Sequence, residues 1–263
     1  SIAMRRTLAI VCFLAAPLYG HEGIHEQLEA VSRAITREPR NAALYLKRGE
    51  LHRLHKEWKD AERDYDRARA LEPDLIAVDL ARGRMLFDAG RAREAIASLQ
   101  LYVRAVPHDA NGHTALARAL MSAGRASDAV KEYELSLPTN ADPDLALEYT
   151  AALTAAGRRA DALRYLDTLP RLVTVELAAI ELELAGGNVE GALRRVEAAQ
   201  ERATRKEEWL ERRGDLLLKL GRTGEARVAY QAALDALSTL PPERRRTRAA
   251  IATERRLRDA LAR

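Results

Sequence analysis

The sequence of 263 residues contains one cysteine, Cys12, and few aromatic residues, which make up 5% of the chain. Cys12 lies in a short apolar run near the start, so removal of that run would leave no thiol for a disulfide or a thiolate metal site. Runs of β-branched and aromatic residues from which a sheet could be built are also few. The chain is rich instead in Ala, Leu, Arg and Glu, which are strong helix formers, and this predicts an all-α fold.

The sequence also lacks a large net charge and a catalytic motif. The formal net charge of +4 is too small to indicate nucleic acid as a partner. There is no glycine loop of the phosphate-binding type, no His-Glu-x-x-His sequence and no Gly-x-Ser-x-Gly turn. The carboxylates have the spacing of solvated helix faces. We therefore expect no enzymatic activity, no cofactor, no nucleic-acid binding and no small-molecule ligand.

The first 20 residues predict export. Residues 1–3 precede the first methionine and resemble residues added by cloning, and a basic pair then precedes the apolar run 8–18. A basic start before an apolar run shorter than about 20 residues is typical of an export signal rather than of a membrane span. Cleavage after Ala16 or Gly20 would leave a mature chain without a transmembrane span, in the periplasm or the cell envelope. An uncleaved apolar N-terminal helix is the alternative.

Small residues recur at an interval of 34 along the chain. Ala61, Ala95 and Ala129 are each 34 residues apart. The same interval separates Gly49 from Gly83, Gly90 from Gly124, and Pro73 from Pro107. A fixed period of this length is typical of stacked helix pairs in which each pair contacts only its neighbours.

A Gly-Arg-x-x-x-Ala sequence marks the turn within each helix pair. It begins at Gly90, Gly124, Gly157 and Gly221. Glycine supplies the left-handed conformation that ends the first helix of a pair. The alanine that follows five residues later is small enough for the two helices to approach closely.

Residues 42–75 carry the fullest version of the pattern. Its residues, with their positions in the 34-residue unit in parentheses, are Tyr45 (4), Gly49 (8), Trp58 (17), Ala61 (20), Tyr65 (24), Ala68 (27) and Pro73 (32). This pattern resembles the tetratricopeptide repeat family, from roughly Glu22 to the C-terminus. The resemblance implies a right-handed superhelical solenoid of about six antiparallel helix pairs, with an N-terminal half repeat and a C-terminal capping helix.

The resemblance divides the chain after the export signal as follows: a half repeat at 21–41, repeat units at 42–75, 76–109, 110–143, 143–172, 173–206 and 207–240, and a capping helix at 241–263. The fourth and fifth units are irregular, because Ala162 and Ala192 are only 30 residues apart and Pro170 comes early. They are either a hinge or degenerate repeats.

In this family the first helix of each pair lines a concave groove, so the resemblance implies a non-enzymatic scaffold or adaptor that binds another protein or peptide there. Arg84 and Arg118, one repeat apart, could hold the acidic part of an extended peptide. Alternatively, the groove arginines pair with neighbouring glutamates and only keep the groove soluble. The predicted groove residues are Lys47, Arg53, Leu80, Arg84, Phe87, Asn111, Thr114, Arg118, Met121 and Leu147.

Histidines near the N-terminus support a different function. His21 and His25 are four residues apart and His52 and His55 are three apart, so each pair would share one helix face. Because the two helices would be adjacent, these imidazoles could bind Zn or Cu. The alternative function is therefore a periplasmic metal-binding module. Packing at His52 and simple surface exposure at His55 would explain the same residues without a metal.

Overall fold

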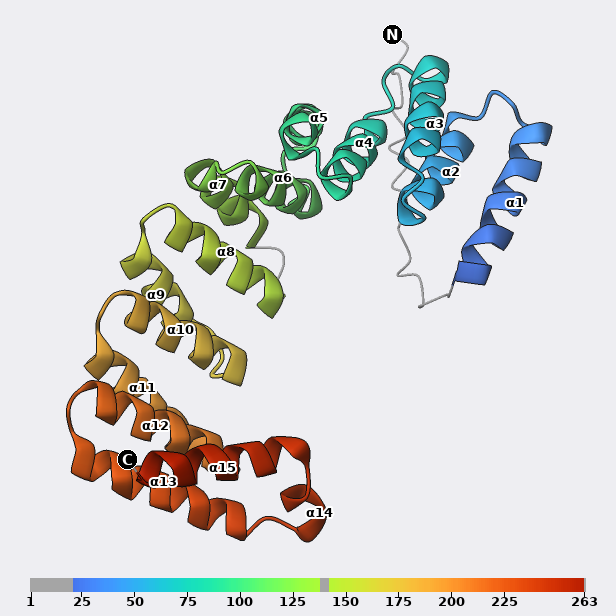
Figure 1. Cartoon of the computed structure of the whole chain (residues 1–263). Helices are drawn as coiled ribbons and strands as arrows, with labels where there is room; N and C mark the ends of the chain where they lie inside the picture. Colours follow the sequence, from blue (N-terminus) through green and yellow to red (C-terminus); the bar gives the residue numbers. More distant parts are fainter. Residues whose placement is uncertain (1–20, 138–141, 263) are drawn as a thin grey trace. The chain divides into compact units, whose positions relative to one another are not determined.

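The computed structural model describes residues 21–137 and 142–262, so the expected export signal lies outside the described residues. In this part of the chain every regular element is a helix (Figure 1). The helices are α1 (His21–Arg37), α2 (Ala42–Leu54), α3 (Trp58–Leu71), α4 (Ala77–Asp88), α5 (Ala92–Ala105), α6 (Ala110–Ser122), α7 (Ala126–Ser136), α8 (Pro143–Ala155), α9 (Arg159–Thr168), α10 (Val173–Ala185), α11 (Val189–Arg202), α12 (Glu207–Lys219), α13 (Thr223–Ser238), α14 (Pro242–Arg245) and α15 (Arg248–Ala262).

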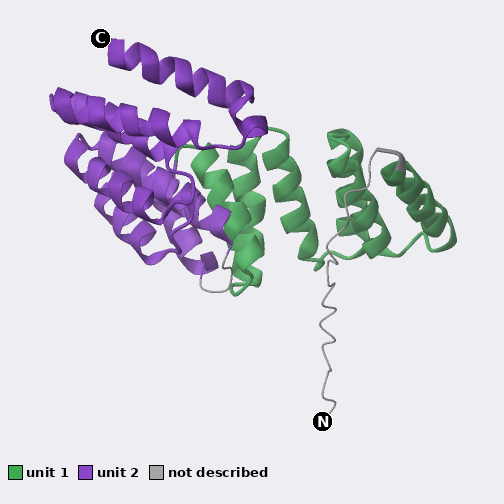
Figure 2. Cartoon of the chain, turned by 90° about the horizontal axis from the view of Figure 1, so that it is seen from below, with its two compact units in different colours: residues 1–124 green, residues 125–263 purple. Residues whose placement is uncertain are grey.

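The chain divides into two compact units, residues 1–124 and residues 125–263 (Figure 2). In the first unit each helix from α1 to α5 packs on the next one, and α2, α4 and α6 also contact one another in turn. In the second unit the same succession runs from α7 to α13, and α15 packs on α13. Contacts between neighbouring helices of this kind confirm the predicted all-α solenoid of stacked helix pairs.

The periodic alanines lie where the helices approach most closely. Ala61, Ala95, Ala129, Ala162, Ala192 and Ala226 are all fully buried, with 0% of their surface exposed. A large buried side chain comes four residues after most of them, as at Tyr65, Leu99, Tyr133 and Tyr230. Glycines on the first helix make room for these side chains, since a methyl group at Gly49 would lie 2.5 Å from the Tyr65 ring. The repeat interval therefore separates equivalent packing contacts in successive helix pairs.

The turns within the helix pairs share one backbone geometry. Gly90, Gly124, Gly157 and Gly187 have φ of 77° and Gly221 has φ of 73°. In the turns at Gly90, Gly157, Gly187 and Gly221, the residue after the glycine donates its backbone N–H to a carbonyl five residues back, as from Arg91 to Leu86 at 2.8 Å. This hydrogen bond satisfies an orphan carbonyl at the helix end. In the first pair the same conformation falls on Lys56, whose φ is 61°.

The irregular repeats form two helix pairs, α8 with α9 and α10 with α11. Helix α9 has only 10 residues, because Leu169 is extended (ψ 160°) ahead of Pro170. The short interval between Ala162 and Ala192 reflects this early end of α9.

The C-terminal segment was expected to be one helix, but it forms two, α14 and α15. Arg246 and Thr247 separate them. Leu257 on α15 is 1% exposed and packs in the core cluster of the last helix pairs. None of the described helices is both long enough and apolar enough to cross a membrane.

Candidate functional site

A hollow in the first unit lies on the inner helices α2, α4 and α6. Its cavity volume is about 280 Å³. The residues that line it are Arg53, Arg84, Phe87, Asp88, Leu99, Asn111, Thr114, Ala115 and Arg118. All of these residues except Leu99, which is on α5, come from the first helices of successive pairs, and α4 contacts both α2 and α6.

Six of the ten predicted groove residues lie together in this hollow: Arg53, Arg84, Phe87, Asn111, Thr114 and Arg118. The other four do not line it. Lys47 is exposed on α2, and Leu80 and Met121 are partly buried outside the hollow. Leu147 belongs to the second unit, where it packs against Leu166, Val175 and Ala179. Leu147 is partly buried against this core cluster, and its place in a groove stays a prediction.

Arg53 is neutralised by carboxylates on two helices. It forms an ion pair with Glu50 at 3.2 Å on its own helix and a second one with Asp88 on α4. Burial alone would lower the pKa of Arg53, but the Glu50 and Asp88 carboxylates outweigh burial and raise that pKa. Arg53 therefore fits the alternative in which the groove arginines pair with neighbouring carboxylates.

Arg84 differs from Arg53. Among the described residues, no carboxylate lies within ion-pair distance of its guanidinium group. The positive charge of Arg84 acts on Tyr102: burial and a hydrogen bond to Asp109 raise the pKa of Tyr102 to about 12, and Arg84 partly opposes this rise. Phe87, one helical turn later, is partly buried and lines the same hollow. The hollow therefore places an arginine without a carboxylate partner next to an aromatic ring.

Asp88 is a lining residue that the sequence did not indicate. It follows Arg84 by one helical turn, so its place on the inner face of α4 could be found from helical spacing. Its ion pair with Arg53 joins residues 35 positions apart, and that partner depends on how two repeats pack.

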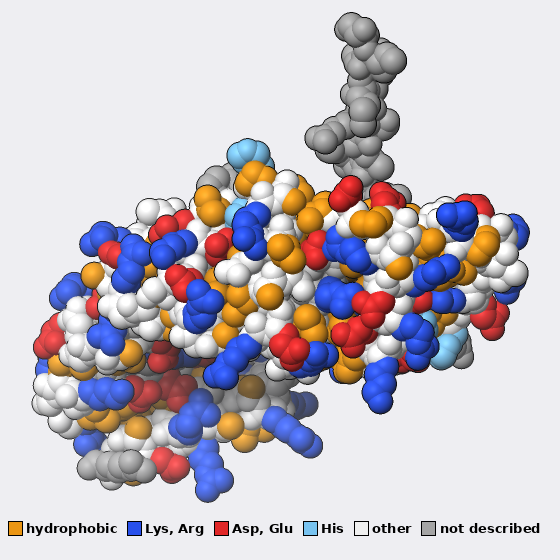
Figure 3. Space-filling view, turned by 90° about the horizontal axis from the view of Figure 1, so that it is seen from above, with side chains coloured by type: hydrophobic (Ala, Val, Ile, Leu, Met, Phe, Trp, Pro, Cys, Tyr) orange, Lys and Arg blue, Asp and Glu red, His pale blue; other side chains and the backbone are white. Residues whose placement is uncertain are grey.

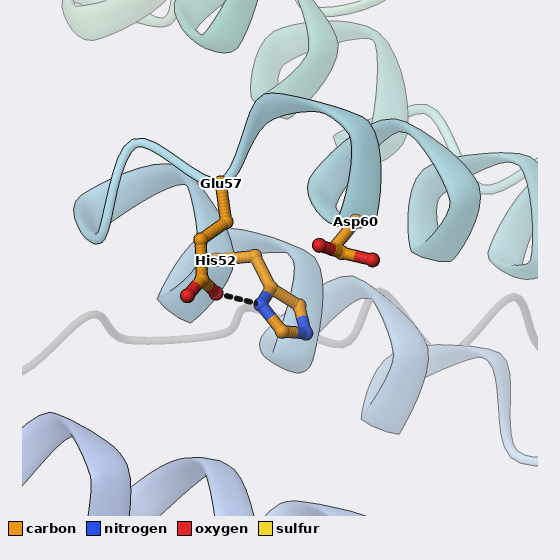
Figure 4. Close-up of side chains that lie close together, drawn as sticks. All are labelled: His52, Glu57 and Asp60. Atoms are coloured by element: carbon orange, nitrogen blue, oxygen red, sulfur yellow. Dashed lines mark hydrogen bonds and ion pairs between the residues drawn. The ribbon is translucent and has the colours of Figure 1, made fainter.

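A second group of residues with functional chemistry lies at the turn between α2 and α3 (Figure 4). The His52 Nδ1 atom is 2.6 Å from Glu57 Oε2. Asp60 faces the same space from the first turn of α3, and the ligand atoms of His52, Glu57 and Asp60 all lie within 4.8 Å of one another. The His55 Nδ1 atom is 3.8 Å from the other Glu57 oxygen.

This cluster differs from the predicted set of four histidines. The rings of His25 and His55 meet edge to face, 4.8 Å apart, so α1 and α2 do bring two of the histidines together. His52 instead faces Glu57 and Asp60, which the sequence prediction missed. His21 begins α1, but its side chain lies outside the described residues. The comparison of turns could have revealed Glu57, because that position holds arginine in four other repeats.

Comparisons with known proteins agree with this architecture. Residues 148–248 match the family described as a tetratricopeptide repeat-like domain, and residues 25–141 match the bacterial transcriptional activator domain. No curated protein sequence matches the chain.

Solved structures share the fold at low identity. A tetratricopeptide repeat protein from Parabacteroides merdae has a TM-score of 0.55 and 15% identity over 92% of each chain. YrrB, described as a TPR protein with an unusual peptide-binding site, has a TM-score of 0.57 and 19% identity over 66% of this chain and 92% of its own. PilW, a type IV pilus biogenesis factor, has a TM-score of 0.56 and 18% identity over 68% of this chain and 86% of its own.

At these identities the solved structures show the fold alone. Three observations agree on stacked tetratricopeptide-type helix pairs: that fold, the 34-residue interval of buried alanines and the match over residues 148–248. The chain has the fold of tetratricopeptide repeat proteins, and its residues 148–248 match the tetratricopeptide repeat-like family.

Proposed function

We propose that this protein is a non-enzymatic scaffold that binds an acidic segment of a partner protein in the hollow of its first unit. The observation that carries the proposal is Arg84, which has no carboxylate partner in residues 21–137 and 142–262 and lies beside Phe87 in a hollow on the inner helices. The peptide-binding site named for YrrB supports the choice of a peptide as the ligand.

The side chains of the hollow suit an extended peptide with at least one carboxylate. The Arg84 guanidinium can donate two parallel hydrogen bonds to a carboxylate, which is the strongest pairing available to it. Phe87 offers an apolar contact one turn away, and Asn111 on α6 is exposed and offers an amide to the peptide backbone. Arg118 adds a second cation on the same helix as Asn111. Specificity for acidic sequences follows from Arg84, which forms no ion pair with a carboxylate among the described residues.

Charge over the rest of the surface is mixed. Lys and Arg side chains alternate with Asp and Glu over the face seen in Figure 3, in keeping with the small net charge of +4. Docking would therefore depend on the local charge at Arg84 more than on the field of the whole molecule.

Reversal of charge in the hollow tests the proposal. A charge-assisted hydrogen bond contributes about 1.5–3 kcal/mol, so Arg84→Glu with Arg118→Glu is expected to weaken partner binding by at least about 100-fold. The wild type, immobilised, captures a partner from envelope extract; mass spectrometry identifies that partner, and its affinity is then measured for each variant.

Arg93→Glu with Arg104→Glu on α5 is the matched control, since both arginines are exposed and lie outside the hollow. This control changes the net charge equally and is expected to retain binding. Helicity and thermal unfolding should be unchanged in both variants. Equal affinity of the hollow variant and the wild type would refute the placement of the site.

The proposed location is the periplasm or the cell envelope, and it rests on the basic and apolar start of residues 1–20. N-terminal sequencing of the chain recovered from a periplasmic extract tests this location. A first residue directly after Ala16 or Gly20 is the expected result, whereas an intact Met4 on protein retained in the cytoplasm would overturn it.

A further inference from the structure

The first turn of the repeat series differs from the other five in the residues that it carries. Five turns have glycine in the left-handed conformation, whereas the first has Lys56. The backbone hydrogen bond is the same, because Glu57 donates its N–H to the His52 carbonyl at 2.9 Å. The six turns can therefore be compared position by position, with one backbone and different side chains.

The position of Glu57 holds arginine in four of the other turns. Each of these arginines forms an ion pair with a carboxylate three residues later: Arg91 with Glu94 at 2.6 Å, Arg125 with Asp128 at 2.7 Å, Arg158 with Asp161 at 2.6 Å and Arg222 with Glu225 at 2.6 Å. In the first turn Glu57 takes the place of the arginine, and the carboxylate three residues later remains as Asp60. An internal ion pair is thereby replaced by two carboxylates at the start of one helix.

The position of His52 holds buried leucine in four of the other helices. Leu86, Leu120, Leu153 and Leu217 are at most 5% exposed. The fifth turn shows that this position faces the one after the glycine, because Glu183 accepts a hydrogen bond from Asn188 at 2.7 Å. In the first turn the same two facing positions hold an imidazole and a carboxylate, 2.6 Å apart. The fold thus brings His52, Glu57 and Asp60 to one place, where the other repeats have leucine, arginine and an acid.

We infer that His52, Glu57 and Asp60 form a site for a divalent first-row transition metal ion such as Zn²⁺. Imidazole nitrogen and carboxylate oxygen bind Zn²⁺ at about 2.0–2.2 Å, so ligand atoms that lie within 4.8 Å of one another need only small side-chain rotations to enclose an ion. Three protein ligands leave a coordination position for water. The side chains of Glu57 and Asp60 are 40% and 43% exposed, which gives an ion access from solvent.

The neighbouring charges decide which carboxylates can take part. Asp64 is 3.8 Å from the other nitrogen of His52, but Arg48 holds it through two hydrogen bonds of 2.7 Å. Asp60 pairs with Arg63 at 2.7 Å, and the Arg63 side chain is 75% exposed, so it can turn away into solvent. Glu57 pairs with histidine alone among the described residues. Glu57 and Asp60 are therefore the carboxylates available to an ion.

A calorimetric titration of the full chain with Zn²⁺ tests this site, with Co²⁺ absorption as a second readout of the ligand set. The key variant is His52→Leu with Glu57→Arg, because it restores the residues of the other turns and should keep the fold. Loss of an outer-shell partner alone costs about 10–100-fold in metal affinity. Loss of two ligands is therefore expected to weaken Zn²⁺ binding by at least about 100-fold.

Two further variants sharpen the test. Asp60→Asn is expected to weaken binding by at least about tenfold. His108→Ala removes an exposed histidine outside the cluster and is expected to leave the titration unchanged. The inference is overturned if the wild type shows no saturable Zn²⁺ binding or if His52→Leu with Glu57→Arg binds like the wild type. Binding that survives this variant but is lost in His25→Ala would place the ion on other histidines and would equally overturn it.

Discussion

At the scale of single residues, Lys56 is the one non-glycine residue with positive φ in the part of the chain that the structure describes. The left-handed conformation costs an L-residue with a side chain about 1–2 kcal/mol. Glycine avoids this cost but loses more backbone freedom on folding. Lys56→Gly is therefore expected to raise the free energy of unfolding by about 1 kcal/mol, measured from the urea midpoint.

Gly221→Ala is the matched comparison, since nothing lies within 4 Å of the added methyl group and only the backbone conformation changes. It is expected to lower the free energy of unfolding by about 1 kcal/mol. If Lys56→Gly destabilised the protein as much as Gly221→Ala does, the assigned strain at Lys56 would be wrong.

The sequence predicted the residues whose roles depend on local geometry. Gly90, Gly157 and Gly221 were recognisable because the turn demands a residue that tolerates positive φ. Lys56 was not, because a left-handed lysine leaves no signal beyond the absence of glycine. The partners of charged residues could not be predicted from the sequence: Arg53 and Arg84 both line the hollow, yet Arg53 pairs with two carboxylates, whereas Arg84 pairs with none in the described part of the chain.

At the scale of helices, hydrogen bonds between tyrosine and carboxylate groups recur at one spacing. Tyr65 donates to Glu50, Tyr133 to Glu148, Tyr149 to Glu134 and Tyr230 to Asp215, each across 15 residues. Each of these bonds joins two neighbouring helices. The repeat pattern of the sequence includes Tyr65, but the hydroxyl partners depend on how the neighbouring helices face each other and could not be predicted from the repeat interval.

These contacts predict how stability changes at alkaline pH. Burial, together with the Glu134 carboxylate, raises the pKa of Tyr149 to about 12. In the unfolded chain a tyrosine titrates near pH 10, so the folded state holds the proton more tightly between pH 10 and 12. The stabilisation is fully present below about pH 10 and is lost as pH rises toward 12.

An absorbance titration of tyrosinate at 295 nm measures this effect. Part of the tyrosine ionisation is expected to be delayed to about pH 12, and Tyr149→Phe should remove a portion of the delayed change. Denaturant midpoints should fall as pH rises from 10 to 12. A variant whose delayed absorbance change equals that of the wild type would contradict the role given to Tyr149.

At the scale of the whole molecule, the 34-residue interval was enough to predict the helix pairs. Buried alanines such as Ala61 and Ala226 must recur wherever two helices approach closely, and this constraint acts on the sequence of every repeat. The binding site is less constrained, since surface residues in the hollow affect packing little. The repeat pattern therefore placed six of the predicted groove residues in one hollow, but it did not reveal that Leu147 packs in a separate core cluster.

The central claim is that the hollow on α2, α4 and α6 docks an acidic segment through Arg84. The most direct measurement is a calorimetric titration of the acidic segment of the captured partner into the wild type, Arg84→Glu and Arg93→Glu. The account predicts that Arg84→Glu alone weakens binding by at least about tenfold, while Arg93→Glu binds like the wild type. Equal affinities for all three proteins, or a loss in Arg93→Glu alone, would contradict it.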